Sequence, residues 1–408
     1  MKPTFIHLFK ARIAWLVIAG LMATLAACGG GTSVAGDPGS GGTGSYSSGA
    51  VSGFGSVILN NTRFADSAAT VENEDGETVD ADKGALSTSS LQMGMIVEVE
   101  GGTVTAATVS GGLATSTAEV IRITNQLLGP VDDFSSSSLG MLGQHIDVNA
   151  ATVLEGVSSL AEANSSNCAY AEVYAYFNSA TLRYAASRIA CLSSRPVTYR
   201  LFGPVSSLDT SASTFSVNGL TVSYAGLTAP SGLANGATVR IRLANTWTSG
   251  TAAATRLAVR TKTVQSTQSA TVEGLITHYT SKFSFTVNGV PVVATSSTEF
   301  ETEALGNGSR VKVEGKLSNG QLLAQSVEEI SDSDLEDESQ EAIGTISNLN
   351  TSAQTFTLTT SGGRSFSVDY TGVSDAPTLT DGATVEVEGK LASDGTTITA
   401  TEVELGSD

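Results

Sequence analysis

A short pattern occurs five times along this 408-residue chain, and it constrains the fold more than any other feature. Each copy opens with glycine, has valine or isoleucine two residues later, and has an aromatic residue or leucine five residues after the glycine. The copies begin at Gly49, Gly129, Gly203, Gly274 and Gly344. Recurrence at a nearly fixed period is typical of repeated structural units, so the sequence predicts five of them.

The fourth unit shows the expected strands most clearly. Residues 283–287 (Phe-Ser-Phe-Thr-Val) alternate apolar and polar side chains, which is typical of a half-buried strand. Asn288-Gly289 follows and is a strong hairpin signal, because both turn positions need a positive φ. The strands predicted for this unit are residues 274–279, 283–287, 290–293, 310–315 and 323–327, with a short helix or loop over 298–305.

The other units keep this frame. The fourth strand returns as Val-Glu-Val-Glu-Gly at 97–101 and 385–389, where alternation predicts buried valines and exposed glutamates. On this basis Glu98, Glu100, Glu386 and Glu388 are expected in solvent. The fifth strand is expected where alanine precedes an apolar residue by three positions, at 106–109, 186–189, 254–257, 324–327 and 400–403.

The predicted order is a strand, a two-stranded hairpin, a short helix or loop, and a second hairpin. That is the order of an OB-type five-stranded barrel. The predicted fold class is therefore all-β, a tandem array of five small five-stranded OB-like β-barrel domains. A β-sandwich built from paired repeats is the rival architecture.

Two segments of the first unit carry a family resemblance. Residues 53–60 (Gly-Phe-Gly-Ser-Val-Ile-Leu-Asn) and 93–101 (Met-Gly-Met-Ile-Val-Glu-Val-Glu-Gly) resemble the bacterial domain of unknown function 5666. The resemblance is best in units one, four and five, fair in three and poor in two. It implies small β domains in tandem, in predicted lipoproteins, with no established activity.

The N-terminus is predicted to be a targeting segment. Lys2, Lys10 and Arg12 precede the apolar residues 13–25, and Leu25-Ala26-Ala27-Cys28 resembles the lipobox of bacterial lipoproteins. The resemblance implies that Cys28 is acylated and that the mature chain is anchored in a membrane. Gly29 in place of aspartate favours the outer membrane. The alternative is an ordinary secretory signal with a chance cysteine.

These boundaries divide the chain into eight segments. They are the signal peptide (1–27), the lipidated cysteine with a Gly/Ser-rich flexible linker (28–48), repeat 1 (49–124), repeat 2 (125–195), repeat 3 (196–264), repeat 4 (265–330), an acidic linker (331–340) and repeat 5 (341–408).

Charge is distributed unevenly along the chain. Without the leader there are 18 basic and 40 acidic residues, yet residues 183–262 hold nine basic residues and one acid. Either this basic stretch packs against acidic neighbours, or it forms a patch for an anionic ligand such as a glycan. The patch would comprise Arg183, Arg188, Arg240, Arg242, Arg256 and Arg260. Nucleic acid is not an expected partner, because the net charge opposes phosphate contacts.

The remaining cysteines predict a disulfide. Cys168 stands where the other repeats have glycine before the fourth strand, and Cys191 ends the fifth strand. These two strands form a hairpin, so the thiols can lie opposite each other in an oxidising compartment. A Cys168–Cys191 disulfide is therefore expected, rather than a redox pair.

Residues for catalysis or metal binding are not apparent. His145 and His278 lie in different repeats and are expected on the surface, and neither a cofactor nor a metal is predicted. The acidic run at 332–343 opens like a calcium loop but lacks its glycine and has Ile343 at its last position. A solvated linker is expected there, with weak divalent-cation binding as the alternative. A second acidic run crosses residues 72–82.

These observations favour a non-enzymatic lipoprotein of the cell envelope that presents OB-like surfaces to an envelope component such as an anionic glycan. The first alternative is a structural or adhesive spacer without a small ligand. The second is a glycan hydrolase that uses paired carboxylates.

Overall fold

The computed structural model describes residues 44–108, 112–246, 250–260, 262, 265–302, 304–331, 334–335 and 339–406. The leader, Cys28 and almost all of the linker lie outside the described residues. Among the residues described, no helix is both long enough and apolar enough to cross a membrane.

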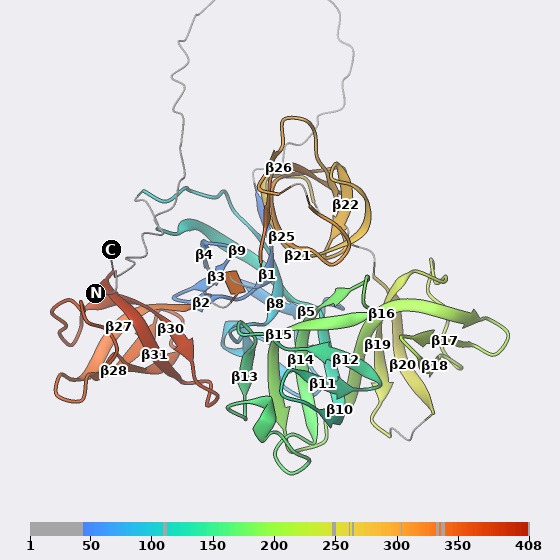
Figure 1. Cartoon of the computed structure of the whole chain (residues 1–408), viewed down its shortest axis with the longest axis horizontal. Helices are drawn as coiled ribbons and strands as arrows, with labels where there is room; N and C mark the ends of the chain where they lie inside the picture. Colours follow the sequence, from blue (N-terminus) through green and yellow to red (C-terminus); the bar gives the residue numbers. More distant parts are fainter. Residues whose placement is uncertain are drawn as a thin grey trace, which may run out of the picture. The chain divides into compact units, whose positions relative to one another are not determined.

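Repeat 4 is a closed five-stranded barrel (Figure 1). Its long first strand β21 (Thr267–Ser281) pairs with β22 (Ser284–Val287) through one half and with β25 (Arg310–Ser318) through the other. Strand β22 pairs with β23 (Val290–Val293), which runs parallel to β26 (Gln321–Glu329). Because β26 pairs with β25, the strand order 1-2-3-5-4-1 closes the sheet, as in an OB barrel.

The other four repeats close in the same order, which confirms the predicted OB-like fold. Repeat 1 uses β1 (Ser45–Ala50) with β2 (Gly53–Phe54), then β3 (Val57–Leu59), β4 (Thr62–Ala65), β8 (Ile96–Gly101) and β9 (Ala114–Ile123). Repeat 2 uses β10 (Gln126–Phe134), β11 (Ser138–Met141), β12 (Gln144–Asp147), β14 (Tyr170–Asn178) and β15 (Arg183–Leu192). Repeat 3 uses β16 (Thr198–Asp209), β17 (Thr214–Val217), β18 (Leu220–Ser223), β19 (Thr238–Ala244) and β20 (Thr251–Val259). Repeat 5 uses β27 (Gln340–Asn350), β28 (Thr355–Thr360), β29 (Ser365–Asp369), β30 (Thr384–Leu391) and β31 (Thr397–Leu405).

Three repeats add a short strand parallel to the second half of strand five. These are β5 (Thr70–Asn73) in repeat 1, β13 (Val153–Glu155) in repeat 2 and β24 (Glu299–Phe300) in repeat 4. The short helix or loop predicted over 298–305 is therefore wrong at its start, where β24 pairs with β26. Repeat 1 also has a small hairpin of β6 (Val79–Asp80) and β7 (Gly84–Ala85), followed by the 3-10 helix η1 (Thr88–Ser90), and repeat 2 has η2 (Leu160–Glu162).

A bulge explains the glycine that ends Val-Glu-Val-Glu-Gly. In every barrel the pairing of strands four and five shifts register at this point. A Cβ atom on Gly101, Gly315 or Gly389 would lie 2.1–2.2 Å from a carbonyl oxygen of strand five. In repeats 1, 4 and 5 the backbones approach too closely for a side chain, so the motif marks the bulge there, whereas Ala175 and Leu243 stand at the shift in repeats 2 and 3.

The fifth strand of repeat 1 lies later than predicted. Residues 106–109 were expected to begin it, but β9 starts at Ala114, and Ala118 and Ile121 occupy the alanine and apolar positions. Thr105 forms only an isolated bridge with Thr115. The connection before β9 is longer than in the other repeats, and it carries a chance copy of the pattern.

The barrels share strands and cores. Strand β1 pairs in parallel with β21 of repeat 4, and β2 pairs in parallel with β27 of repeat 5. One buried apolar cluster joins repeats 1 and 5, another joins repeats 2 and 3, and Tyr46 of repeat 1 packs into the cluster of repeat 4. Because small barrels bury limited surface alone, this sharing supplies core that each lacks.

The disulfide between Cys168 and Cys191 is present, as predicted, with the Cα atoms 4.6 Å apart. It joins Cys168, two residues before β14, to Cys191, the last but one residue of β15. It therefore closes the open end of the hairpin between the fourth and fifth strands of repeat 2.

Candidate functional site

The acidic run of repeat 1, residues 72–82, includes a structured turn at the end of β5. After β5, the side-chain oxygen of Asn73 accepts hydrogen bonds from the backbone N–H groups of Asp75 and Glu77, at 2.9 and 3.1 Å. This turn fixes the backbone that carries Glu74, Asp75 and Glu77. The carboxylates are thus held in a defined position at the edge of repeat 1.

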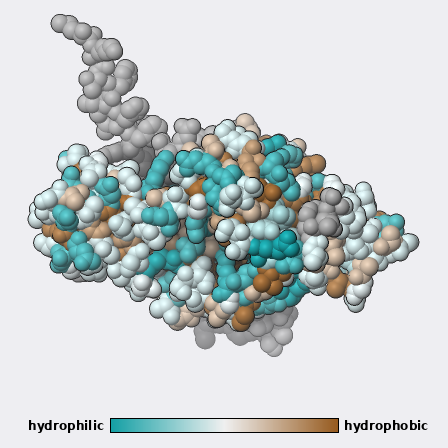
Figure 2. All heavy atoms as spheres, turned by 90° about the horizontal axis from the view of Figure 1, so that it is seen from below, coloured by the Kyte–Doolittle hydropathy of each residue, from teal (hydrophilic) through white to brown (hydrophobic). Residues whose placement is uncertain are grey.

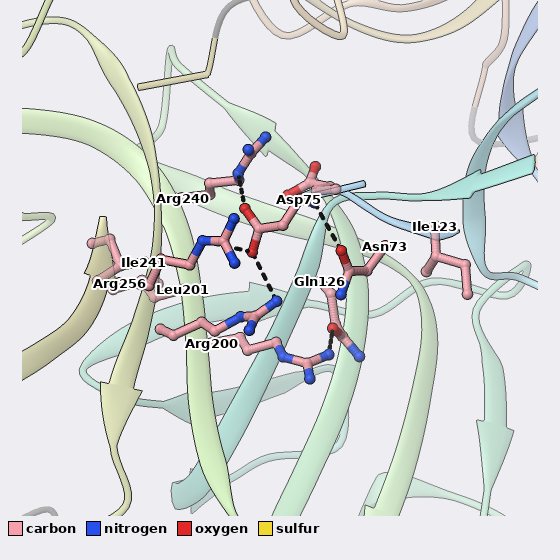
Figure 3. Close-up of a pocket in the computed structure, with 11 residues that line it drawn as sticks. Asn73, Asp75, Ile123, Gln126, Arg200, Leu201, Arg240, Ile241 and Arg256 are labelled. Carbon is pink, nitrogen blue, oxygen red and sulfur yellow. Dashed lines mark hydrogen bonds and ion pairs between the residues drawn. The ribbon is translucent and has the colours of Figure 1, made fainter. Parts of the chain in front are cut away.

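Asp75 is the centre of an ion-pair cluster with repeat 3 (Figure 3). Its two oxygens contact Arg240 Nε at 2.7 Å and Arg242 Nη2 at 2.8 Å, and Arg256 Nε lies 3.4 Å away. Glu77 pairs with Arg242 and Arg256. The Asp75 side chain is only 9% exposed, so this carboxylate meets three guanidinium groups with little help from solvent, and Glu77 shares two of them.

Two further pairs extend this cluster, which we call the arginine–carboxylate junction. Arg260 of repeat 3 contacts Glu74 at 3.2 Å, and Arg200 contacts the buried Asp80 at 2.7 Å. A hydrogen bond from Arg242 lowers the pKa of Glu77 to about 2. Burial raises the pKa of Asp80, but Arg200 and backbone donors outweigh it, and the net pKa is lowered.

Glu98 corrects a sequence expectation. Glu98 was expected on the exposed face of its strand, but its side chain is 7% exposed and contacts Lys262 Nζ at 2.8 Å. Glu100, which was also expected in solvent, is half-buried. Burial raises the pKa of Glu98, but the positive charges of Lys262 and Arg260 lower it by more, so the pKa lies below its ordinary value. Strand alternation predicts which side chains point away from the core of their own barrel, but it cannot predict that another repeat covers those side chains.

A cleft of about 520 Å³ runs beside the junction, and a smaller hollow of about 40 Å³ lies beneath the arginines. Both acids and bases line the cleft, among them Glu72, Glu98, Arg122 and Lys262. Arg122 contacts Glu72 at 2.6 Å. The charges in the cleft are thus engaged with one another across it.

The six arginines of the predicted anionic-ligand patch do not form one open surface. Arg240, Arg242, Arg256 and Arg260 come together, but each contacts a carboxylate of repeat 1. Arg183 pairs separately with Asp147. Arg188 is 2% exposed, pairs with Glu155 and donates a hydrogen bond to the carbonyl of Met93. Its burial lowers its pKa to about 10. The basic stretch therefore packs against acidic neighbours, the first of the two interpretations above.

Repeat 5 carries glutamates on neighbouring strands without this compensation. Glu341 on β27 lies opposite Glu388 on β30, which lies opposite Glu402 on β31. Burial, with Glu386 and Glu388, raises the pKa of Glu341 to about 8 from an ordinary value of 4.5. The folded state therefore keeps a proton that the unfolded chain loses.

This proton predicts a pH dependence of stability. The stabilisation is complete below about pH 4.5 and is lost as the pH rises through about 8, with a slope of up to about 1.4 kcal/mol per pH unit. We expect Glu341→Gln to flatten urea-unfolding free energies measured from pH 5 to 9. Glu119→Gln, at an exposed position of repeat 1, is the control and should leave the slope unchanged. An unchanged slope in Glu341→Gln would assign the dependence elsewhere.

An aromatic face on repeat 4 was missed by the sequence reasoning. Phe283, in the turn between β21 and β22, is 41% exposed and meets Phe300 edge to face at 6.2 Å. Lys282 Nζ lies 5.4 and 5.2 Å from the two ring centroids. Figure 2 shows that hydrophilic and apolar side chains are interspersed over one face of the molecule. The sequence feature at this place is the alternation at 283–287, but it predicts an ordinary half-buried strand and does not indicate an exposed aromatic pair.

His145 and His278 are exposed and lie in different repeats. Most of the calcium-like run at 332–343 lies outside the described residues, and the residues described contain no group of three or more His, Cys, Asp or Glu side chains arranged to hold a metal ion.

The comparisons with known proteins concern the repeats. A search of curated proteins found no match. A solved structure titled "drosophila Unr CSD456" is similar at 14% identity with a TM-score of 0.13, over 51% of this chain and 98% of that chain. The fold assignment above stands on strand order alone.

A family model matches residues 129–190, 202–258, 273–328 and 343–404. These segments lie in repeats 2 to 5, and they include repeat 2, where the resemblance was poorest in the sequence. Repeat 1, where the resemblance was among the best, is outside them, and its β5–β7 region and its connection to β9 depart from the common frame. Since the matched segments make up more than half of the sequence, the chain belongs to the family described as "Domain of unknown function (DUF5666)".

Proposed function

We propose that this protein is a non-enzymatic lipoprotein of the cell envelope, anchored through Cys28 at the outer membrane, whose joined OB-like barrels bind an envelope glycan. The anchor rests on the lipobox resemblance. The binding role rests on the repeated barrels, because OB folds bind oligosaccharides through strands two and three and the adjoining loops.

The aromatic face of repeat 4 is the observation that carries the binding role. Phe283 lies in the loop between strands one and two, one of the places where OB barrels bind ligands. Exposed rings stack on the apolar faces of sugars, and the Phe283 ring is 41% exposed, so we propose it as the main sugar contact. The arginines are weaker candidates, since carboxylates of the protein already contact them.

Titration of the mature chain with a uronic-acid hexasaccharide tests this role. We expect saturable binding that Phe283→Ala weakens roughly fivefold or more, as loss of an aromatic contact worth about 1 kcal/mol implies. Leu182→Ala is the control, because Leu182 is 55% exposed on repeat 2. Equal binding by both variants, or no saturable binding of acidic or neutral oligosaccharides, would contradict the proposal.

A spacer without a ligand is the second candidate function. The strand pairing of β1 with β21 and of β2 with β27 favours it, because it joins three barrels through backbone hydrogen bonds. A spacer would bind none of the oligosaccharides above. Cell-envelope fractionation of the wild type and of Cys28→Ala tests the anchor for both candidates, and we expect the variant to leave the membrane fraction.

A further inference from the structure

The five barrels differ at one backbone edge. In repeat 4, the side of β26 that faces away from β25 is covered along its length, first by β23 at Leu322–Leu323 and then by β24 at Ser326–Val327. The backbone N–H of Glu301 donates to the carbonyl of Val327 at 3.1 Å. Strands β5 and β13 cover the same edge in repeats 1 and 2.

Repeat 5 leaves this edge open. Strand β29 pairs with β31 only at Thr397–Thr399, and within the described residues no strand pairs with Ala400–Leu405 on that side. The N–H of Gly406 donates to the carbonyl of Thr384 on the β30 side at 2.9 Å. Backbone groups of successive residues in an antiparallel pair face the partner strand alternately, so those of Thr401, Val403 and Leu405 face away from β30, toward the open side. Val403 is the counterpart of Val327, whose carbonyl is used in repeat 4.

A groove lies along the open edge. It has a volume of about 610 Å³ and runs between the segment 372–377 and residues 401–405. The four steps of about 3.4 Å from Thr401 to Leu405 offer about 14 Å of edge to a partner. The side chain of Leu405, which is 56% exposed, lies in its lining. Unpaired strand edges of this kind are templates for an added strand. Repeat 3 also lacks the extra strand, so the charge beside the edge distinguishes repeat 5 from it.

The charge around the groove selects the partner. Glu402 and Glu404 line it, and Asp375 stands on the opposite wall. Across the strand pair, Glu402 lies opposite Glu388 and Glu404 opposite Glu386, so like charges face each other. Among the described residues, no lysine or arginine forms a salt bridge with these four glutamates. Burial and the neighbouring carboxylates raise the pKa of Glu402, which reflects the same repulsion.

We propose that repeat 5 binds an extended peptide segment with lysine or arginine at alternate positions, which adds to β31 as a parallel strand at the place that β24 fills in repeat 4. The backbone of Thr401–Leu405 supplies the hydrogen bonds. The glutamates supply the preference for basic side chains. This surface is on a different barrel from the aromatic face, and the inference does not depend on glycan binding.

Titration of the full mature chain with a ten-residue peptide of alternating lysine and threonine tests this inference. We expect saturable binding and slower hydrogen exchange within residues 400–405, where the open edge exchanges quickly in the free protein. The same peptide with proline replacing each threonine keeps its charge but lacks half of its N–H donors, and it should bind at least tenfold more weakly.

The acidic side chains are tested by the double variant Glu402→Gln/Glu404→Gln, which we expect to weaken peptide binding at least tenfold. Glu328→Gln is the matched control, because Glu328 is the counterpart of Glu404 in repeat 4, where β24 covers the edge. Equal binding of the proline peptide would show attraction by charge alone and overturn the inference. Absence of saturable binding, or protection confined to another repeat, would overturn it as well.

Discussion

Replacing Gly94 with alanine is expected to destabilise the protein far more than the same change at Gly382. Both glycines occupy the turn before strand four and have a positive φ, of 78° and 88°. A Cβ on Gly94 would lie 2.6 Å from the carbonyl oxygen of Ser187 in repeat 2, whereas Gly382 has no heavy atom within 4 Å of that position. The two sites share the backbone strain and differ in the contact between repeats.

The contact at Gly94 is closely packed. The hydroxyl of Ser187 donates to the Gly94 carbonyl at 2.7 Å, and Arg188 donates to Met93 at 3.1 Å. Left-handed backbone strain costs about 1–2 kcal/mol in either variant, and forced repacking adds about 1–3 kcal/mol for Gly94→Ala alone. Urea unfolding of both variants measures the difference. Equal losses would mean that repeats 1 and 2 do not meet at this turn.

Replacing Asp75 with asparagine is the second large expected effect. The change removes the carboxylate shared by Arg240, Arg242 and Arg256, and it leaves three guanidinium groups close together. Glu77 still pairs with Arg242 and Arg256, but Arg240 loses its carboxylate and Asp75 is largely buried, so we expect a cost of about 2–4 kcal/mol in the free energy of unfolding.

Asp147→Asn provides the control for this prediction. Asp147 also pairs with an arginine, but its side chain is 48% exposed and solvent screens the pair. We expect no measurable change in stability from it. Salt should narrow the gap between Asp75→Asn and the wild type, because it screens repulsion among the exposed parts of the arginines. Equal stability of the two variants would place Asp75 in solvent.

The sequence predicted the barrels well because the relevant signals are local. Asn288-Gly289 sets a hairpin turn, and the alternation at 284–287 and 310–315 sets which side chains face the core, although Phe283, just before it, is exposed. The glycine of Val-Glu-Val-Glu-Gly follows from a close approach of two backbones within one barrel. Where a local signal occurred by chance, as at 106–109, the prediction failed.

The candidate sites could not be predicted in the same way, because they depend on contacts between repeats. Glu98 has the pattern of an exposed strand residue, and only Lys262, 164 positions later in the chain, makes it a buried one. Charge counts did show that residues 183–262 are basic and 72–82 acidic. They could not show that Asp75 lies among three arginines, since pairing of distant charges depends on how barrels dock.

A double-mutant cycle between Asp75 and Arg240 tests most directly the claim that the basic stretch is bound by the acidic loop of repeat 1. The unfolding free energies of the wild type, Asp75→Asn, Arg240→Gln and the double variant give the coupling between the two side chains. The 2.7 Å contact predicts a coupling of about 1–3 kcal/mol. A coupling of zero, with the two losses simply adding, would contradict the account.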